Sequence, residues 1–124
     1  MTYGDNGGGS FELQEVRSIG FRNLGTVGAI WLNDNKYGGD LGEDTPILVM
    51  DDDEFITYYK ISADPEHLVQ WIGIKTNKGR HIESGTWWKG GVHDERENIR
   101  VLRIGGRTGS MVDQLSIEFC PWPQ

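Results

Sequence analysis

The stretch GGRTGSMVD, residues 105–113, lies between two strand-like runs at residues 99–104 and 114–119. Its glycines and small side chains leave backbone amides uncovered, and Asp113 adds a carboxylate whose two oxygens accept hydrogen bonds. The composition predicts a tight, open loop between two strands. We expect this loop to hold a small polar ligand by its hydroxyl groups, with the rest of the chain as a β scaffold.

Apolar and polar residues alternate on both sides of this loop and again at residues 11–15. Alternation of this kind indicates half-buried strands. No segment has a persuasive helical period, and the eighteen glycines fall mostly between the alternating runs. We therefore predict an all-β domain of about ten short strands, as in a sandwich, barrel or prism. The other predicted strands cover residues 16–22, 26–32, 46–50, 55–62, 67–76 and 80–83.

Short polar segments between these runs are predicted to be turns. Residues 33–36 contain Asn and Asp, which tolerate left-handed backbone angles. Residues 77–79 form a three-residue hairpin loop with glycine at the left-handed position. A further turn is predicted at residues 64–66, and residues 84–98 are the least regular part. Residues 121–123 contain two prolines and cannot continue a central strand.

The overall composition limits the possible classes of protein. A chain of 124 residues fits one domain, residues 1–124. A net charge of −7 argues against binding nucleic acid, and no apolar run is long enough for membrane insertion. The single cysteine excludes an intrachain disulfide and is compatible with a cytoplasmic location. No signal peptide is visible, so we leave the localisation unknown.

Three segments, in the expected order, resemble the jacalin-related lectin family. Gly4-x-x-Gly7-Gly8-x-x-Phe11 resembles its glycine-rich opening, and residues 69–79 resemble its central hairpin. Gly109-x-x-x-Asp113 is similar to its sugar-binding loop. The resemblance implies an all-β fold, β-prism I, with three four-stranded antiparallel Greek-key sheets around a pseudo-threefold axis. It also implies that the first strand joins the sheet of the last strands.

The resemblance implies a sugar site formed by residues from both ends of the chain. In that site the Asp113 carboxylate accepts hydrogen bonds from two adjacent sugar hydroxyls, which are charge-assisted and strong. The amides of Ser110 and Met111 donate to sugar oxygens, and the Gly8 amide donates from the other side. Gly109 completes the loop, and the Met111 side chain lies against the apolar face of the sugar.

The resemblance also implies the partners of this site. An uncleaved chain of this type favours mannose or glucose over galactose. Residues 23–27 lack an aspartate, so we expect one primary site, and the short segment at 64–66 leaves an extended subsite open. One shallow site binds weakly, so avidity requires a homodimer or larger assembly. The alternative is a jacalin-like protein-interaction module that has lost sugar binding.

Other residues that could carry chemistry give weaker signals. Residues 51–54 could bind calcium, but a solvated turn is the better interpretation. His67, His81 and His93 are too scattered for a zinc site. Cys120 has no neighbouring base, so we expect no enzyme, no metal and no cofactor. An enzyme or a metal-dependent protein remains a rival to the lectin interpretation.

Trp87 and Trp88 are the main feature that these expectations do not explain. Adjacent residues of a strand point to opposite faces, so at least one of the two rings is expected to be exposed. Tryptophan packs in cores and interfaces, and it also stacks on sugars. Packing is the preferred interpretation of the pair, with a second sugar contact as the alternative.

Overall fold

The computed structural model describes residues 1–64, 66 and 68–123. This part of the chain contains strands and loops but no helix, as predicted. The strands are β1 (Thr2–Gly4), β2 (Gly9–Glu15), β3 (Ser18–Asn23), β4 (Val27–Leu32), β5 (Asn35–Gly38), β6 (Glu43–Asp44), β7 (Leu48–Val49), β8 (Ile56–Ala63), β9 (Val69–Thr76), β10 (His81–Gly85), β11 (Val92–Arg96), β12 (Ile99–Thr108) and β13 (Val112–Pro121).

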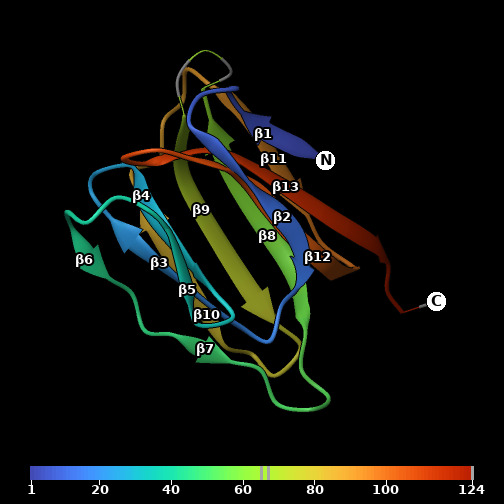
Figure 1. Ribbon diagram of the computed structural model, residues 1–124. Helices are drawn as coiled ribbons and strands as arrows, with labels where there is room; N and C mark the ends of the chain where they lie inside the picture. Colours follow the sequence, from blue (N-terminus) through green and yellow to red (C-terminus); the bar gives the residue numbers. More distant parts are fainter. Residues whose placement is uncertain (65, 67, 124) are drawn as a thin grey trace.

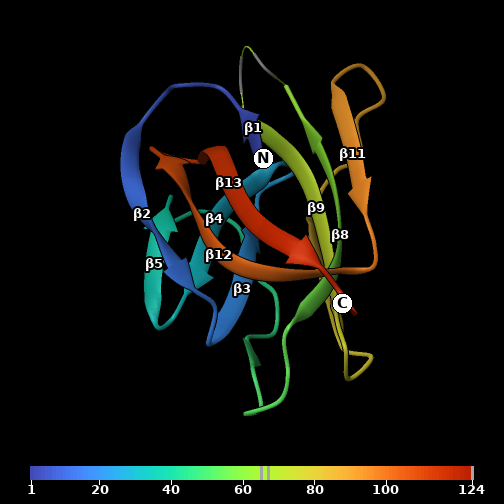
Figure 2. The same ribbon diagram turned by 90° about the vertical axis from the view of Figure 1, so that its right-hand side faces the viewer.

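The strands form three antiparallel sheets (Figures 1 and 2). The first sheet has the order β1-β13-β12-β2, the second β10-β9-β8-β11, and the third β5-β4-β3-β6. In the third sheet β7 also pairs with β3, at Ser18 and Ile19, whereas β6 pairs at Arg22 and Asn23. The two short strands thus share the fourth position, and the expected three four-stranded sheets are confirmed.

Each sheet is a Greek key, in which a fourth strand returns to lie beside the first of three hairpin-connected strands. In the second sheet β11 returns to β8, and in the third β6 and β7 return to β3. In the first sheet β2 lies beside β12, and β1 lies beside β13. The chain ends therefore fall inside this one Greek key, and the expected pairing of the first strand with the last is confirmed.

The core lies between the three sheets and receives side chains from all of them. Phe21 and Ile30 come from the third sheet, Tyr59 and Ile72 from the second, and Leu115 from the first. All five side chains are buried, and they alternate with more exposed residues along several strands. Burial of apolar area at about 25 cal/mol per Å² makes this shared core the main stabilising contribution.

Two hairpin turns form as their residue types predict. Asn33 and Asp34 both have positive φ angles, 53° and 73°, as a two-residue turn of the primed type requires. Gly79 has a φ angle of 79° and closes the β9–β10 hairpin. The predicted turn at 64–66 includes Pro65, and the predicted strand at 67–76 begins with His67. Both residues lie outside the described part, in which Glu66 is in a turn and the strand starts at Val69.

The strands around the opening stretch are longer than predicted. Gly105 and Gly106 lie within β12 rather than in a loop. A Cβ atom at Gly105 would stand 2.7 Å from the Leu13 nitrogen of β2, and one at Gly106 would stand 2.1 Å from the Gln114 oxygen of β13. These glycines therefore allow close approach of the neighbouring backbones at a β-bulge.

Two further boundaries differ from the prediction. The irregular region at 84–98 contains β11, an edge strand whose sequence VHDER carries no apolar alternation and is mostly solvent-accessible. Periodicity could not find it, because neither face packs into the core. At the other end, β13 extends to Pro121. β1 pairs only with residues 114–116, so Pro121 has no neighbouring strand on that side that needs its missing amide hydrogen.

Candidate functional site

Asp113 lies at the second position of β13 and faces the loop between β1 and β2. A Cβ atom at Gly7 would stand 2.9 Å from its Oδ1 atom, and one at Gly8 would stand 2.8 Å from its Oδ2 atom. At Gly109 the corresponding distance to Oδ2 is 3.6 Å. Three glycines therefore surround the carboxylate, and a side chain at position 7 or 8 would collide with it.

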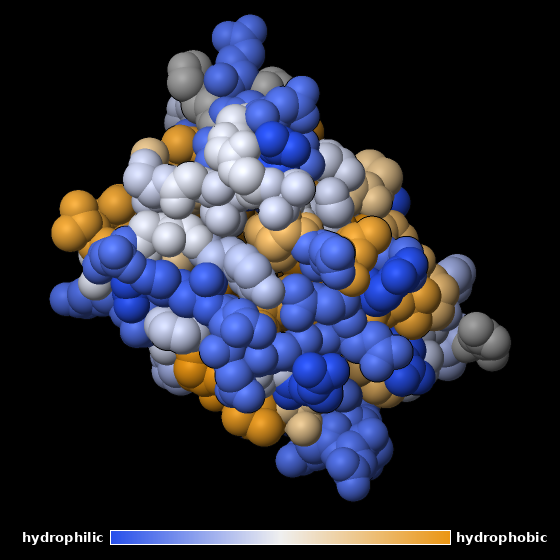
Figure 3. Space-filling model, viewed as in Figure 1, coloured by the Kyte–Doolittle hydropathy of each residue, from blue (hydrophilic) through white to orange (hydrophobic). Residues whose placement is uncertain are grey.

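The structure brings the two ends of the chain together at this point. Thr108 of β12 pairs with Gly9 of β2, so the β1–β2 loop lies against the β12–β13 hairpin (Figure 1). Residues of intermediate hydropathy gather at this upper end of the molecule, as the space-filling view shows (Figure 3). The exposed residues there include Gly7, Gly8, Gly9, Gly109 and Ser110, whose small side chains leave the backbone accessible to a ligand that makes hydrogen bonds.

Three amides at this site have no hydrogen-bond partner among the described residues. They belong to Gly8, Ser110 and Met111, the three predicted donors. The Gly109 amide differs, because it donates to the Met111 carbonyl at 3.0 Å and closes the hairpin. The site thus combines one acceptor carboxylate with three unpaired donors.

The Met111 side chain contacts the third sheet through its sulfur. The Thr26 hydroxyl, in the β3–β4 hairpin, donates to the Met111 sulfur at 3.2 Å. The Ser110 carbonyl lies against Gly39, where a Cβ atom would stand only 2.1 Å from that oxygen. The tip of the β12–β13 hairpin therefore packs on the third sheet, which fixes the directions of its amides.

Two side chains that sequence reasoning missed fasten the β1–β2 loop. Arg107 donates through Nε to the Gly7 carbonyl at 3.1 Å and through Nη2 to the Gly8 carbonyl at 2.8 Å. Gln114 donates to the Asp5 carbonyl at 3.0 Å. Arg107 and Gln114 are opposite each other in the β12–β13 ladder. No sequence motif predicts that this pair binds the β1–β2 loop, because the contact depends on how the folded sheet places the loop beside the two side chains.

The electrostatic setting of Asp113 is unusual for a surface carboxylate. Burial raises its pKa, and the nearby Asp5 carboxylate raises it further. The backbone of Gly109 and the charge of Arg107 act in the opposite direction and lower the pKa. The result is a partly desolvated acceptor whose folded-state pKa is above the ordinary value.

Several solved structures resemble this fold over almost the whole chain. Malaysian banana lectin is 18% identical, with a TM-score of 0.78 over 98% of this chain and 96% of that one. The chain has the β-prism fold of jacalin-related lectins. AcmJRL, a mannose-binding jacalin-related lectin from Ananas comosus, is 18% identical, with a TM-score of 0.77 over 98% and 96% of the two chains. Artocarpin bound to mannotriose is 20% identical, with a TM-score of 0.75 over 97% and 95%.

The likeness of this β-prism to the lectins is one of structure rather than sequence. Neither a family model nor a curated protein sequence matches the chain. The three structures compared above are those of lectins.

Elsewhere in the β-prism, two of the four acidic residues 51–54 make internal contacts through their side chains. The Glu54 side chain is buried and accepts a hydrogen bond from the Thr76 hydroxyl at 2.7 Å and from Arg80 Nε at 2.9 Å. Asp53 pairs with Lys78 at 2.8 Å. Among the described residues, no group of three or more His, Cys, Asp or Glu side chains is placed to hold a metal ion. The same residues include no helix that could cross a membrane.

Proposed function

We propose that residues 1–124 act as one carbohydrate-binding domain that recognises mannose- or glucose-type sugars at Asp113. The observation that carries this proposal is the grouping of one carboxylate with the amides of Gly8, Ser110 and Met111, which have no partner among the described residues. Adjacent hydroxyls of a pyranose can donate to the two oxygens of Asp113, while its other oxygens accept from the amides.

The ligands of similar proteins support the choice of sugar. Three of the matched structures are described as a mannose-binding lectin, as artocarpin with mannotriose and as artocarpin with methyl-α-mannose. One carboxylate and three amides offer few contacts, so the affinity of a single site is expected to be near millimolar, about −4 kcal/mol. Multivalent display on a homodimer or larger assembly would then provide useful avidity.

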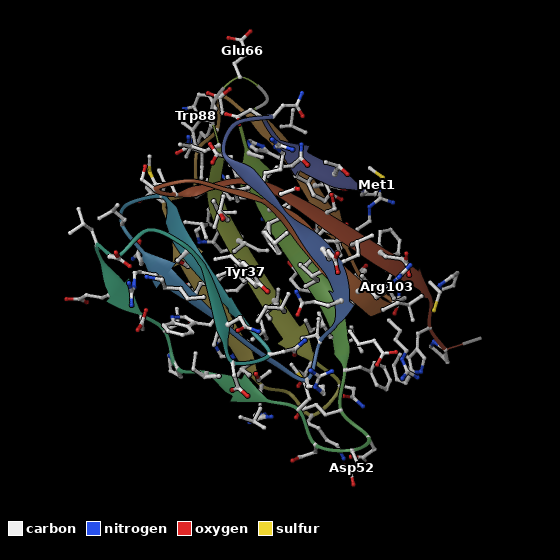
Figure 4. All side chains as sticks on the ribbon, viewed as in Figure 1. Met1, Tyr37, Asp52, Glu66, Trp88 and Arg103 are labelled. Carbon is white, nitrogen blue, oxygen red and sulfur yellow. The ribbon has the colours of Figure 1, made fainter. Side chains whose placement is uncertain are left out.

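Calorimetry with methyl α-mannoside and methyl α-glucoside tests the site directly. Asp113→Asn removes the charged acceptor and keeps the size of the side chain. We expect affinity to fall by about tenfold to a hundredfold, since hydrogen bonds to charged groups contribute about 1.5–3 kcal/mol. Asp52→Asn is the matched control, because it makes the same change in charge at the opposite end of the molecule (Figure 4).

The outcomes separate the proposal from its alternative. Binding that survives Asp113→Asn would place the sugar elsewhere on the surface. If the unaltered protein bound no glycan on a broad array, the alternative of a protein-interaction module would replace the lectin proposal.

A further inference from the structure

A cluster of aromatic rings covers the outer face of the second sheet, away from Asp113. The rings of Trp71 in β9 and Trp87 meet edge to face, with centroids 5.4 Å apart. The His93 ring of β11 lies 4.5 Å from Trp87, and Lys60 Nζ of β8 lies 4.6 Å from the Trp87 centroid. Trp87 remains 36% exposed, so the cluster is accessible to solvent.

The ring of Trp71 packs against a glycine of the second sheet. A Cβ atom at Gly73, in the middle of β9, would stand 2.6 Å from Trp71 Cη2. Gly73 does not have a positive φ angle, so its backbone does not require glycine. Glycine within a strand weakens it, and here the missing side chain lets the Trp71 ring lie close to the sheet.

Trp88 is seated in the same way beside this face. Cβ atoms at Gly90 and Gly91 would each stand 2.8 Å from its ring, and the ring remains 39% exposed. Trp88 lies at the same end of the molecule as Glu66 (Figure 4). Trp71 and Trp88 both pack against glycines and stay accessible to solvent. This arrangement contributes little to a core but presents flat apolar surface to a ligand.

The hollow beside Trp71 is shallow. It has a volume of about 100 Å³ and is lined by Tyr58, Trp71, Gly73, Lys75, His81 and Glu83, among others. Pockets for small molecules are typically about 300–1,000 Å³. A ligand of this face must therefore lie across the rings, with at most a substituent entering the hollow, which favours an extended chain over a compact molecule.

The polar groups around the rings include both donors and acceptors. The ammonium groups of Lys60 and Lys75 lie over aromatic rings, and neither forms an ion pair within the described residues. Glu83 is exposed on the same face, and Glu95 accepts a hydrogen bond from Tyr58. Hydroxyl groups match such a mixture because each one both donates and accepts. An anionic ligand would meet the glutamates, and a cationic ligand would meet the lysines.

We propose that the outer face of the second sheet is a second carbohydrate surface, which binds an extended, uncharged glycan chain by stacking of pyranose rings on Trp71 and Trp87. The ring faces of tryptophan cover the C–H faces of the sugars, while Lys60, Lys75 and Glu83 bind their hydroxyls. This surface is separate from Asp113: the β1–β2 loop and β11 lie on opposite sides of the molecule in Figure 2. It does not depend on the function proposed for Asp113.

The test uses the full chain carrying Asp113→Asn, so that the first site is weakened. The probes are neutral hexasaccharides of β-1,4-linked mannose, glucose and xylose, with methyl α-mannoside as the small probe. We expect at least one hexasaccharide to bind, and Trp71→Ala to weaken it at least tenfold in the same background. Trp122→Ala is the control, because that tryptophan is also accessible to solvent, at 37%, but packs against Phe55 instead of the second sheet's outer face.

Indole N–H signals give a second readout if Trp71→Ala fails to fold. The chain has five tryptophans, and bound hexasaccharide should shift the signals of Trp71 and Trp87 but not that of Trp31 in the third sheet. The proposal is overturned if no neutral hexasaccharide binds the Asp113→Asn protein, if only charged glycans such as polygalacturonate bind, or if binding persists unchanged without Trp71. Loss of methyl α-mannoside binding alone would bear only on the first site.

Discussion

At the scale of single residues, the negative charge of Asp113 lowers the stability of the fold. Burial and the charge of Asp5 raise its pKa, so the folded protein holds this carboxylate less favourably than the unfolded chain does. Stability from this group is therefore highest at low pH and falls as pH rises through the interval between its unfolded and folded pKa values. Functional sites often accept such a cost.

Asp113→Asn should therefore separate stability from binding. At pH 7 we expect an unchanged or slightly raised midpoint of thermal unfolding, because the variant removes a disfavoured charge. Sugar binding should fall. For the unaltered protein, binding should weaken on acidification at a pH above the ordinary aspartate pKa, about 3.9. Calorimetric titration across pH 3–8 measures the sugar affinity, and thermal unfolding over the same range measures stability. A large drop in the unfolding midpoint of Asp113→Asn at pH 7 would contradict the view that the Asp113 charge destabilises the fold.

Gly8 is expected to tolerate no side chain. Its φ angle is +68°, and a Cβ atom would stand 2.4 Å from the Thr108 carbonyl. Gly8→Ala should lose about 1–3 kcal/mol of stability and displace the loop from Asp113. Gly25→Ala is the matched control, since Gly25 also has a positive φ angle, +79°, but nothing within 4 Å of a Cβ. Equal effects of the two changes on sugar affinity would count against the close packing of Gly8.

Arg107 is expected to act as a positioning residue. Arg107→Gln removes its two hydrogen bonds to the β1–β2 loop, at about 0.5–1.5 kcal/mol each. We expect sugar affinity to fall by about threefold to thirtyfold, together with a loss of about 1–3 kcal/mol of stability from the two hydrogen bonds. Arg107→Lys should restore part of the affinity. Arg17→Gln is the control for the change in charge, and calorimetry measures the sugar affinity of each variant. An equally large fall in the affinity of Arg17→Gln would argue against a specific role of Arg107.

At the scale of elements, the sequence predicted most strands that show apolar alternation and missed β1, β6 and β11, which are short strands at sheet edges. β12 and β13 were found from alternation, but β12 was ended too early because Gly105 and Gly106 resemble loop residues, and β13 was predicted too short at both ends. β11 was missed because it is an exposed edge strand. Periodicity reports burial, so it is silent where a strand is held by backbone pairing alone.

The candidate site divides in the same way. Asp113 and Gly8 could be named from a motif, because their roles depend on local backbone geometry. Arg107 and Gln114 could not, since their partners lie about a hundred residues away along the chain. The seating of Trp71 on Gly73 is likewise a property of the folded sheet.

Glu54 joins two elements at the end of the molecule away from the sugar site. Thr76 and Arg80 bind its buried carboxylate and lower the pKa of Glu54 to about 2. Because the folded pKa is lowered, this contribution is present above the ordinary value and is lost as pH falls toward 2. Glu54→Gln should cost about 2–3 kcal/mol at pH 7 and much less near pH 2. Chemical denaturation at both pH values measures this loss of stability. A loss that does not vary with pH would contradict the role of the ionised Glu54 carboxylate. The sugar affinity of Glu54→Gln should not change.

At the scale of the whole molecule, hydrogen bonds between buried groups connect the sheets. The Tyr3 hydroxyl of the first sheet lies 2.5 Å from that of Tyr59 and donates to Asp94 at 2.6 Å, both in the second sheet. Burial raises the pKa of Tyr59, so this hydroxyl stays protonated throughout the neutral range. The contact ties the short β1 to the rest of the β-prism.

Tyr3→Phe tests this connection between the sheets. It keeps the ring packed against Tyr59, with centroids 5.8 Å apart, and deletes only the hydroxyl. We expect a loss of about 1–3 kcal/mol, because Asp94 and Tyr59 lose a partner in a partly buried position. Tyr58→Phe is the control, since its hydroxyl binds Glu95 in an exposed position. Denaturant unfolding of both proteins gives the comparison, and equal costs would argue against a special role of the buried contact.

The placement of both chain ends in the first sheet has a consequence for biosynthesis. β1 and β2 leave the ribosome about a hundred residues before their partner strands β12 and β13, as the separation of Gly7 and Arg107 shows. At about 5–20 residues per second, these two strands wait about 5–20 s with unpaired edges. The proposed sugar site is therefore completed only when β12 and β13 have formed, and a nascent or truncated chain that lacks these two strands has no such site.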